Sequence, residues 1–227
     1  MTTIDTNWIA AHVRRPANAN MRSIISGLQA YPAGLEQPIR FACYLGQLDL
    51  ESGSFIYDRE IWGSKPTAAQ ARYEGRKDLG NTLPGDGFKF RGRTAIQITG
   101  RANTTAFRDW CLTLNPACPD FVQDPDLINT DPWEGLGPIW YWTTHRLNDW
   151  ADRADVHEIT HRINGGYNGL ADRIRWTDAA MVKLSGESDV RAFQRSHALV
   201  PDGVIGPITR GTLFSAMRML PDLQFAV

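Results

Sequence analysis

The stretch PIRFACYLGQLDLESGSF, residues 38–55, decides the fold of this chain. Its apolar side chains recur at helical spacing and cover most of a helix surface, so the helix has to be largely buried. Pro38 suits the first turn of a helix, and the run ESGSF stops it. The stretch therefore predicts a buried helix over residues 38–51 that ends on an acidic side chain, Glu51.

Segments on both sides of this helix repeat the same apolar spacing. They are MRSIISGLQAY (21–31), TAFRDWCL (105–112), LGPIWYWTTHRL (136–147) and DRIRWTDAAMVKL (172–184). Their periodicity predicts a mainly α protein.

Residues 63–103 have a different composition, which is rich in Gly, Asn, Asp, Pro and Arg. Within them only FKFRG (88–92) and TAIQIT (94–99) are candidates for short strands. So many turn formers among polar side chains are typical of a shaped loop region, and long ordered loops commonly carry function. We expect a binding cleft here.

The charge balance excludes some classes of partner. The 227 residues carry 24 Lys and Arg against 25 Asp and Glu, so nothing suggests binding to nucleic acid or to an anionic membrane. No apolar run approaches the roughly 20 residues of a membrane helix, and the start of the chain lacks an export signal. The cysteines, Cys43, Cys111 and Cys118, are too few for a disulfide scaffold, and a Cys111–Cys118 bridge stays open.

Glu51 and Glu60 are the candidate catalytic pair. Burial and the negative end of the helix dipole both disfavour ionisation of Glu51, as a general acid requires. Glu60, in DREIW, is expected on a second short helix, in a more polar setting that keeps it ionised. Such a pair fits glycoside hydrolysis, in which an inverting enzyme holds acid and base about 6.5–9.5 Å apart. A solvated helix end is the alternative for Glu51.

A competing motif is HEITH, residues 157–161. His157 and His161 lie one helical turn apart with Glu158 between them, which is the spacing of a zinc peptidase helix. Charged residues flank the motif, and no third ligand stands in a recognisable motif. We favour a helix that ends at the glycine pair 165–166, with cationic side chains near its C-terminus.

Three runs carry a resemblance to a known family: LESGSF (50–55), EIWGSKPTAAQARYEGRKDLGNTLPGDGFKFRGRTAIQITGRAN (60–103) and ITHRINGGYNGLADRIRW (159–176). Together they resemble the family 19 glycoside hydrolases, and most of all the compact endolysins of bacteriophages and prophages. Several motifs in the right order are far more specific than any one of them. The resemblance implies a chitinase-like, lysozyme-like helical domain that needs no cofactor and no metal.

The resemblance also implies roles for individual residues. Glu51 matches the general acid, Glu60 the general base, and Thr99 the residue that helps hold the attacking water. The residues that match the sugar cleft, or that orient the second carboxylate, are Gln97, Asn103, Asn164 and Arg173. Because INGG belongs to the family pattern, HEITH is interpreted as the helix that leads into it.

Two positions depart from the family pattern. Leu50 stands where family members generally carry His, and Thr104 where an aromatic residue commonly follows RAN. Neither change removes a carboxylate, so both bear on substrate detail more than on activity. Glu74 competes with Glu60 for the role of base, and we favour instead an ion pair of Glu74 with the arginine at position 72, 76 or 93.

Aromatic side chains are candidates for stacking on sugar rings. Trp62 and Tyr73 are the preferred pair, and Tyr167 and Trp176 are weaker candidates. Core packing is an equal or better alternative for each of them. The aromatic cluster at positions 133, 140, 141, 142 and 150 is expected in the core.

The tail VRAFQRSHALVPDGVIGPITRGTLF, residues 190–214, resembles the latter half of a peptidoglycan-binding module. A segment of about 40 residues is short for an independent core, so we expect it to dock on the rest of the chain. The predicted division is a catalytic domain over residues 1–184 and a wall-binding segment over 185–227. A helical cap without ligand affinity is the alternative for the tail.

These observations predict an endolysin that hydrolyses β-1,4 bonds of bacterial peptidoglycan as an inverting muramidase. We expect a monomer that accumulates in the host bacterial cytoplasm and acts on glycan strands after release. Chitin is the rival substrate. Alternatives from other classes are a zinc peptidase that uses HEITH and a wall-binding protein without catalytic activity.

Overall fold

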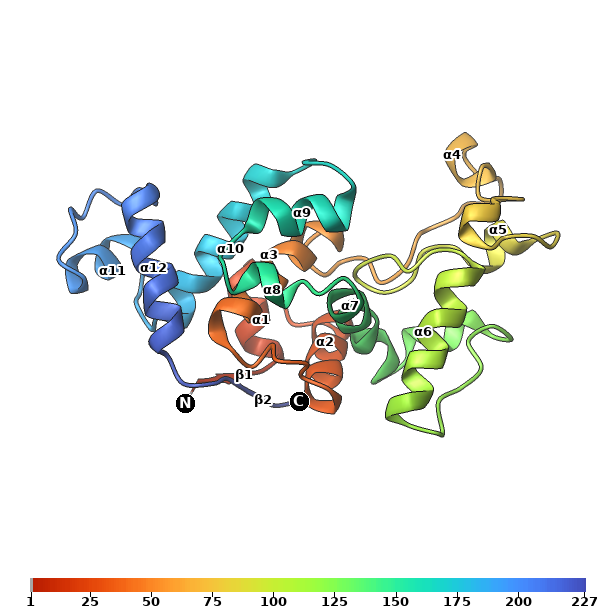
Figure 1. Cartoon of the computed structure of the whole chain (residues 1–227), viewed down its shortest axis with the longest axis horizontal. Coiled ribbons are helices and arrows are strands. Elements are labelled where there is room, and N and C mark those ends of the chain that lie inside the picture. Colours follow the sequence, from red (N-terminus) through yellow and green to blue (C-terminus); the bar gives the residue numbers. More distant parts are fainter. Residues whose placement is uncertain (1) are drawn as a thin grey trace.

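The computed structural model describes residues 2–227 and has the mainly α architecture that the sequence predicts (Figure 1). No helix in this range has the length and apolar character to cross a bilayer. The helices are α1 Thr6–Val13, α2 Ala19–Ala30, α3 Pro38–Glu51, α4 Ala68–Ala71, α5 Asp86–Lys89, α6 Arg101–Leu114, α7 Trp133–Thr144, α8 Asn148–Ala151, α9 Val156–Asn164, α10 Leu170–Leu184, α11 Val190–Ser196 and α12 Pro207–Met219. Short 3-10 helices, η1 Lys77–Leu79 and η2 Pro125–Asn129, and the strands β1 Thr3–Ile4 and β2 Gln224–Phe225 complete the fold.

Helices α3 and α10 pack side by side at the centre of the fold, and Gly46 permits their close approach. A Cβ at Gly46 would lie 2.2 Å from Oγ1 of Thr177 and 3.0 Å from the carbonyl oxygen of Arg173, both on α10. Because packed interiors leave no room for such overlaps, a larger residue would push the helices apart. The close approach brings the start of α10 alongside the end of α3, which carries Glu51.

Helices α2 and α7 make a second close crossing. A Cβ at Gly135 of α7 would lie 1.8 Å from the carbonyl oxygen of Ser23 on α2, and a Cβ at Gly27 would lie 2.3 Å from the backbone of Gly135. Figure 1 shows α7 between the helices on the α3 side of the molecule and those around α6. Helix α7 therefore lies between these two groups of helices.

The loop region over residues 63–103 contains no regular strand, so the predicted strands at 88–92 and 94–99 are wrong. Helix α5 takes up the first of these runs in part. Arg93 and Ile98 exchange backbone hydrogen bonds of 3.1 and 2.7 Å around the turn 94–97, in which Thr94 and Gln97 have positive φ angles. The closed turn leaves neither run free to extend, and only isolated bridges join Arg59 to Arg93 and Arg93 to Ile98.

The two ends of the chain meet. Strands β1 and β2 pair in parallel, with Thr3 opposite Gln224. Arg210 of α12 forms an ion pair with Asp178 of α10 at 2.7 Å, and Phe193 of α11 lies in the same apolar core as the rest of the chain. The C-terminal segment thus packs on the preceding residues, while a domain boundary at residue 184 stays a prediction.

The aromatic cluster lies in the core, as predicted. Trp133, Trp140 and Trp142 are buried, and Tyr141 and Trp150 pack against them partly buried. The three buried tryptophan rings are therefore unavailable as a sugar-stacking surface.

The three thiols are free, which answers the open question of a Cys111–Cys118 bridge. Cys43 and Cys111 are buried, and Cys118 is half-buried. Desolvation raises the pKa of the Cys43 thiol to about 12. Buried thiols with raised pKa values are unreactive, so Cys43 is a packing residue.

Candidate active site

Glu51 occupies the last position of α3, where Arg173 of α10 holds its carboxylate. Arg173 Nη2 donates to Glu51 Oε1 at 2.5 Å, and Nη1 donates to Gln47 Oε1 at 2.6 Å. The Arg173 side chain is 2% exposed, whereas that of Glu51 is 20% exposed. Glu51 therefore stands at the rim of a buried polar network and reaches solvent. The sequence linked Arg173 to the cleft or to the second carboxylate, and the structure shows that it orients the first.

A second layer of hydrogen bonds fixes this network. Gln47 Nε2 donates to Thr160 Oγ1 at 3.2 Å, and the Thr160 hydroxyl donates to the carbonyl oxygen of Val156 at 2.7 Å. Arg173 Nε also donates to the carbonyl oxygen of Asn168 at 3.3 Å. The orientation of Glu51 thus depends on α3, α9 and α10 together.

Leu50 and Thr104, the two departures from the family pattern, are packing residues. A Cβ at Gly169, which caps α10, would lie 2.3 Å from Cδ2 of Leu50, so Leu50 packs against the turn that starts α10. Thr104 is 1% exposed within α6. Neither side chain displaces the network around Glu51.

Glu60 lies on an extended segment, so the prediction of a second short helix is wrong. Its backbone N–H donates to the carbonyl oxygen of Gly92 at 2.8 Å, beside the bridge between Arg59 and Arg93. In the opposite direction, the Gly92 N–H donates to Glu60 Oε2 at 3.4 Å. Backbone pairing with a distant loop overrides the local helical tendency and holds the half-buried Glu60 carboxylate against Gly92.

Gly92 brings together the other predicted residues of this half of the site. A Cβ at Gly92 would lie 2.3 Å from Gln97 Oε1 and 3.2 Å from Thr99 Oγ1. The Thr99 hydroxyl donates to the carbonyl oxygen of Gln97 at 2.8 Å, and Asn103 Nδ2 donates to that of Thr99 at 2.9 Å. Glu60, Gln97 and Thr99 therefore converge on one glycine. The sequence reasoning missed Gly92, although a glycine amid polar loop residues is a signal of close backbone approach.

An aromatic cluster lies beside Glu60. The Trp62 ring is stacked on Tyr73 with centroids 6.2 Å apart and meets Phe88 edge-on at 5.3 Å. Burial first, and then the charge of Glu60, raise the pKa of Tyr73. Phe88, which the sequence reasoning missed, is 54% exposed, and Tyr167 is exposed on a different segment. The preferred pair, Trp62 and Tyr73, therefore stands next to the second carboxylate.

Glu74 has a structural role, but the predicted ion pair with an arginine is wrong. Its Oε1 accepts from the Gly85 N–H at 2.6 Å and its Oε2 from the Gly87 N–H at 2.9 Å. The start of α5 leaves such N–H groups without helical partners, and the two oxygens of Glu74 satisfy them. Both oxygens of Glu74 are occupied, which favours Glu60 as the base.

The HEITH segment forms α9, which ends at Asn164 as predicted. Gly165 caps the helix in the left-handed conformation, and its N–H donates to the carbonyl oxygen of His161 at 2.8 Å. Glu158 pairs with Arg162 at 2.8 Å. Within residues 2–227, no group of three or more His, Cys, Asp or Glu is placed to hold a metal ion. Asn164 is exposed at the helix end, and its place in the cleft stays a prediction.

Helix α7 connects the two halves of the site. A Cβ at Gly137 would lie 2.6 Å from Thr94 Cγ2 and 3.1 Å from Ile98 Cδ1, so the turn that follows Gly92 rests on α7. Tyr141 lies one turn further along, about 6 Å at the rise of an α-helix. Burial, and then the charge of Glu51, raise the pKa of Tyr141, which places this residue near Glu51. The turn that follows Gly92 thus rests on α7 at Gly137, and Tyr141 of the same helix lies near Glu51.

A further carboxyl, Glu134 in the first turn of α7, was not singled out from the sequence. It is 7% exposed. Burial, followed by the negative charges of Asp58 and Asp131, raises its pKa to about 7. Asp58 lies on the extended segment that carries Glu60, so the charge state of Glu134 bears on the stability of this half of the site.

Replacing Glu134 by Gln is expected to remove a pH-dependent loss of stability. The folded pKa of about 7 lies above the ordinary value of 4.5. The neutral form therefore stabilises the folded protein fully below the ordinary pKa, and this contribution is lost as the pH rises through the folded pKa. Between about pH 4.5 and 8 the wild type should lose about 3 kcal/mol of unfolding free energy relative to Glu134→Gln. Urea denaturation across this range measures the difference, and parallel curves would contradict it.

Comparisons with known proteins identify a relative of this chain. The chain is 32% identical over 180 residues to a glycosyl hydrolase family 19 domain-containing protein of Haemophilus influenzae, and the match covers 68% of this chain and 84% of that relative. No protein-family model matches the chain.

Solved structures with a similar fold include chitinase C from Streptomyces griseus, with a TM-score of 0.61 and 19% identity over 80% of this chain and 76% of that one. A bacterial family 19 chitinase has a TM-score of 0.58 and 19% identity over 77% of this chain and 93% of its own. At this identity the likeness concerns the fold alone, and it confirms the predicted chitinase-like architecture.

Proposed function

This chain belongs to glycoside hydrolase family 19, and on that basis we propose that it hydrolyses β-1,4 bonds of bacterial peptidoglycan as an inverting muramidase. Membership of the family makes it a glycoside hydrolase with a glycan substrate. The observation that supports the proposed mechanism is that each carboxylate has its own hydrogen-bond donor, Arg173 for Glu51 and the Gly92 N–H for Glu60.

In the proposed mechanism Glu51 is the general acid. Arg173 occupies Oε1 of Glu51, while Oε2 has no hydrogen-bond partner within residues 2–227. A proton on Oε2 is then free to pass to the glycosidic oxygen of the leaving sugar. Arg173 is a positioning residue, because it acts on the substrate only through Glu51.

Glu60 is the proposed general base. Its Oε2 lies against the Gly92 N–H, on the side where Thr99 Oγ1 also approaches Gly92. A water held between Glu60 and Thr99 attacks the anomeric carbon from the face opposite the leaving group, which inverts its configuration. An inverting mechanism requires about 6.5–9.5 Å between the two carboxyl groups, which leaves room for this water.

Peptidoglycan is the proposed polymer because the C-terminal segment resembles a wall-binding module and packs on the helix that carries Arg173. We propose the biological role of an endolysin, made in the host cytoplasm and acting on the wall after release. Chitin is the second candidate, favoured by the names of the solved structures that share the fold.

Mass spectrometry of the products from purified cell walls and from chitin oligomers tests the function. The wild type and His157→Ala are expected to release muropeptides with new reducing N-acetylmuramic acid ends, whereas Glu51→Gln and Glu60→Gln release none. Activity retained by both Glu variants would overturn the mechanism, as would its loss only in His157→Ala. New amines without reducing ends would indicate a peptidase, products from chitin alone would assign the second candidate, and wall binding without products would indicate a non-catalytic protein.

Replacing Gly92 by Ala is expected to lower kcat about 100-fold with little change in Tm. The new Cβ would overlap Gln97 Oε1, which is the end of a side chain and can move, but its movement disturbs Thr99 and the Glu60 contact. A displacement of about 1 Å near reacting groups has an effect of this size. Gly211→Ala is the matched control, because nothing lies within 4 Å of its Cβ. Equal kcat values for the two variants would contradict the role given to Gly92.

A further inference from the structure

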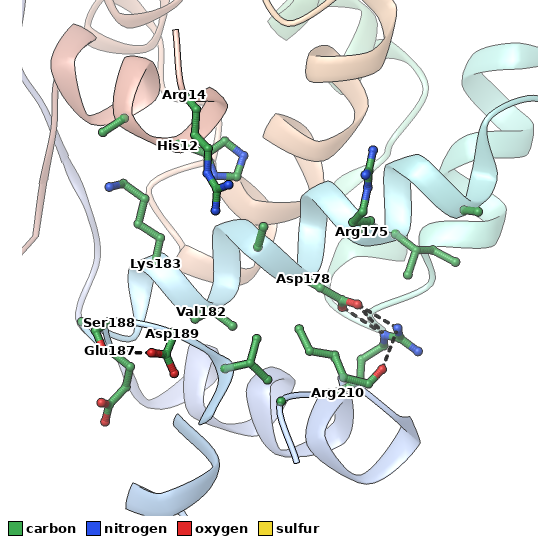
Figure 2. Close-up of a pocket in the computed structure, with 18 residues that line it drawn as sticks. His12, Arg14, Arg175, Asp178, Val182, Lys183, Glu187, Ser188, Asp189 and Arg210 are labelled. Atoms are coloured by element: carbon green, nitrogen blue, oxygen red, sulfur yellow. Dashed lines mark hydrogen bonds and ion pairs between the residues drawn. The ribbon is translucent and has the colours of Figure 1, made fainter. Parts of the chain in front are cut away.

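A cavity of about 880 Å³ lies between α1, α10 and the C-terminal segment (Figure 2). Its lining runs along α10 from Ala171 to Lys183. Neither Glu51 nor Arg173 lines it. The cavity is therefore lined by side chains other than those that hold Glu51, and its volume falls within the range of about 300–1,000 Å³ that is usual for ligand sites.

Charges of both signs line this cavity. Figure 2 shows Arg14, which caps α1, and Arg175 of α10 on one side, and Glu187 and Asp189, from the joint between α10 and α11, on the other. Asp178 and Arg210 also line it, but they form an ion pair with each other. Lys183 adds a second cation from α10. A ligand that spans the cavity would thus meet positive charge at one end and negative charge at the other.

Two of these charges have no protein partner to neutralise them. Within residues 2–227, neither Arg14 nor Glu187 makes an ion pair or a side-chain hydrogen bond. Lys183 also lacks a carboxylate partner, and its Nζ lies 5.0 Å from the centre of the Trp8 ring. Asp189, in contrast, caps α11. Arg14, Lys183 and Glu187 are therefore the groups available to a ligand.

Apolar side chains also line the cavity. Ile174 and Val182 of α10 face the cavity together with Val190 and Ile205 of the C-terminal segment. A neutral sugar carries no charge that unpaired cations and carboxylates in the cavity could neutralise. A short peptide, in contrast, presents a carboxylate, an ammonium group and apolar atoms between them. The lining is more suited to a peptide than to a glycan.

We propose that this cavity binds a short zwitterionic peptide of the kind that peptidoglycan carries on its glycan strands. The peptide carboxylates lie toward Arg14 and Lys183, and its ammonium group lies toward Glu187. The inference rests on the proposed function for the source of the peptide. It gives the junction between the catalytic part and the tail a recognition role of its own, outside the bond-cleaving groups.

Isothermal titration calorimetry with the synthetic tripeptide L-alanyl-γ-D-glutamyl-diaminopimelic acid tests the proposal. The full-length protein is expected to bind it saturably, and Arg14→Gln and Glu187→Gln are each expected to raise Kd about tenfold. The tripeptide with acetylated amines should bind the wild type about tenfold more weakly, since it lacks the ammonium charge. Arg153→Gln is the matched control, because Arg153 is exposed beside Trp150 and does not line the cavity.

Absence of saturable binding, or equal Kd values for all variants, would overturn the proposal. Preferential binding of a tetramer of N-acetylglucosamine would assign the cavity to glycan and would also overturn it. The Glu51→Gln variant separates this inference from the proposed function, because it should bind the tripeptide like the wild type while cleaving no wall. If the wild type cleaves walls but does not bind the tripeptide, only the peptide site is wrong. If it binds the tripeptide but cleaves no glycan, only the proposed muramidase activity is wrong.

Discussion

Replacing Glu51 by Gln is expected to lower kcat for wall hydrolysis about 1,000-fold, near the middle of the range for loss of a general acid. The Gln side chain keeps an oxygen that accepts from Arg173 Nη2, so the network with Gln47 can persist. What it lacks is a proton to release to the leaving oxygen. The release of reducing ends from purified walls measures the effect, and a Tm within about 2 °C of the wild type would show that the fold is retained.

The matched control for this substitution is Glu74→Gln. Glu74 is the other acid considered for the chemistry, but the structure engages both its oxygens with backbone N–H groups at the start of α5. Its replacement should leave kcat within about threefold of the wild type, because it touches no group of the proposed mechanism. If Glu51→Gln kept more than a tenth of the activity, or Glu74→Gln lost as much as Glu51→Gln, the assignment of the acid would be wrong.

Replacing Arg173 by Met is expected to reduce the free energy of unfolding by about 3 kcal/mol, because it removes the hydrogen bonds of a buried guanidinium and leaves their buried acceptors unsatisfied. The guanidinium is 2% exposed and supplies hydrogen bonds to Glu51, Gln47 and the carbonyl oxygen of Asn168. Its removal leaves the buried Gln47 oxygen unsatisfied and Glu51 without its cation. Urea denaturation measures the loss, and kcat should fall as well because Glu51 is no longer oriented.

Arg175→Met is the control on the same helix. Arg175 is exposed, and its ion pair with Asp172 is the kind that contributes less than about 1 kcal/mol. A double-mutant cycle gives a sharper test: Glu51→Gln should change stability less in the Arg173→Met background than in the wild type, because the interaction is already absent. Additive effects, or equal losses for Arg173→Met and Arg175→Met, would contradict the role of Arg173.

The helical elements were predictable because the pattern that specifies them is local. Apolar spacing over a dozen residues is enough to predict α3 and α10, and turn residues predict their ends, as Gly165 does for α9. The same local reasoning failed for Glu60 and for the runs at 88–92 and 94–99. There, backbone pairing between Glu60 and Gly92 and the closed turn from Arg93 to Ile98 outweigh local propensity.

The sequence by itself determined the mainly α architecture, the acid at the end of α3 and the family motifs, because each is encoded by neighbours along the chain. Only the tertiary structure decided that Arg173 holds Glu51, a partner 122 residues away, and that Gly92 gathers Glu60 and Thr99. It also brings Arg14 and Glu187 to one cavity beside α10. The physical reason is that such contacts depend on how closely helices cross. A glycine that lets two backbones approach fixes that distance, and no local pattern reveals which backbone it meets.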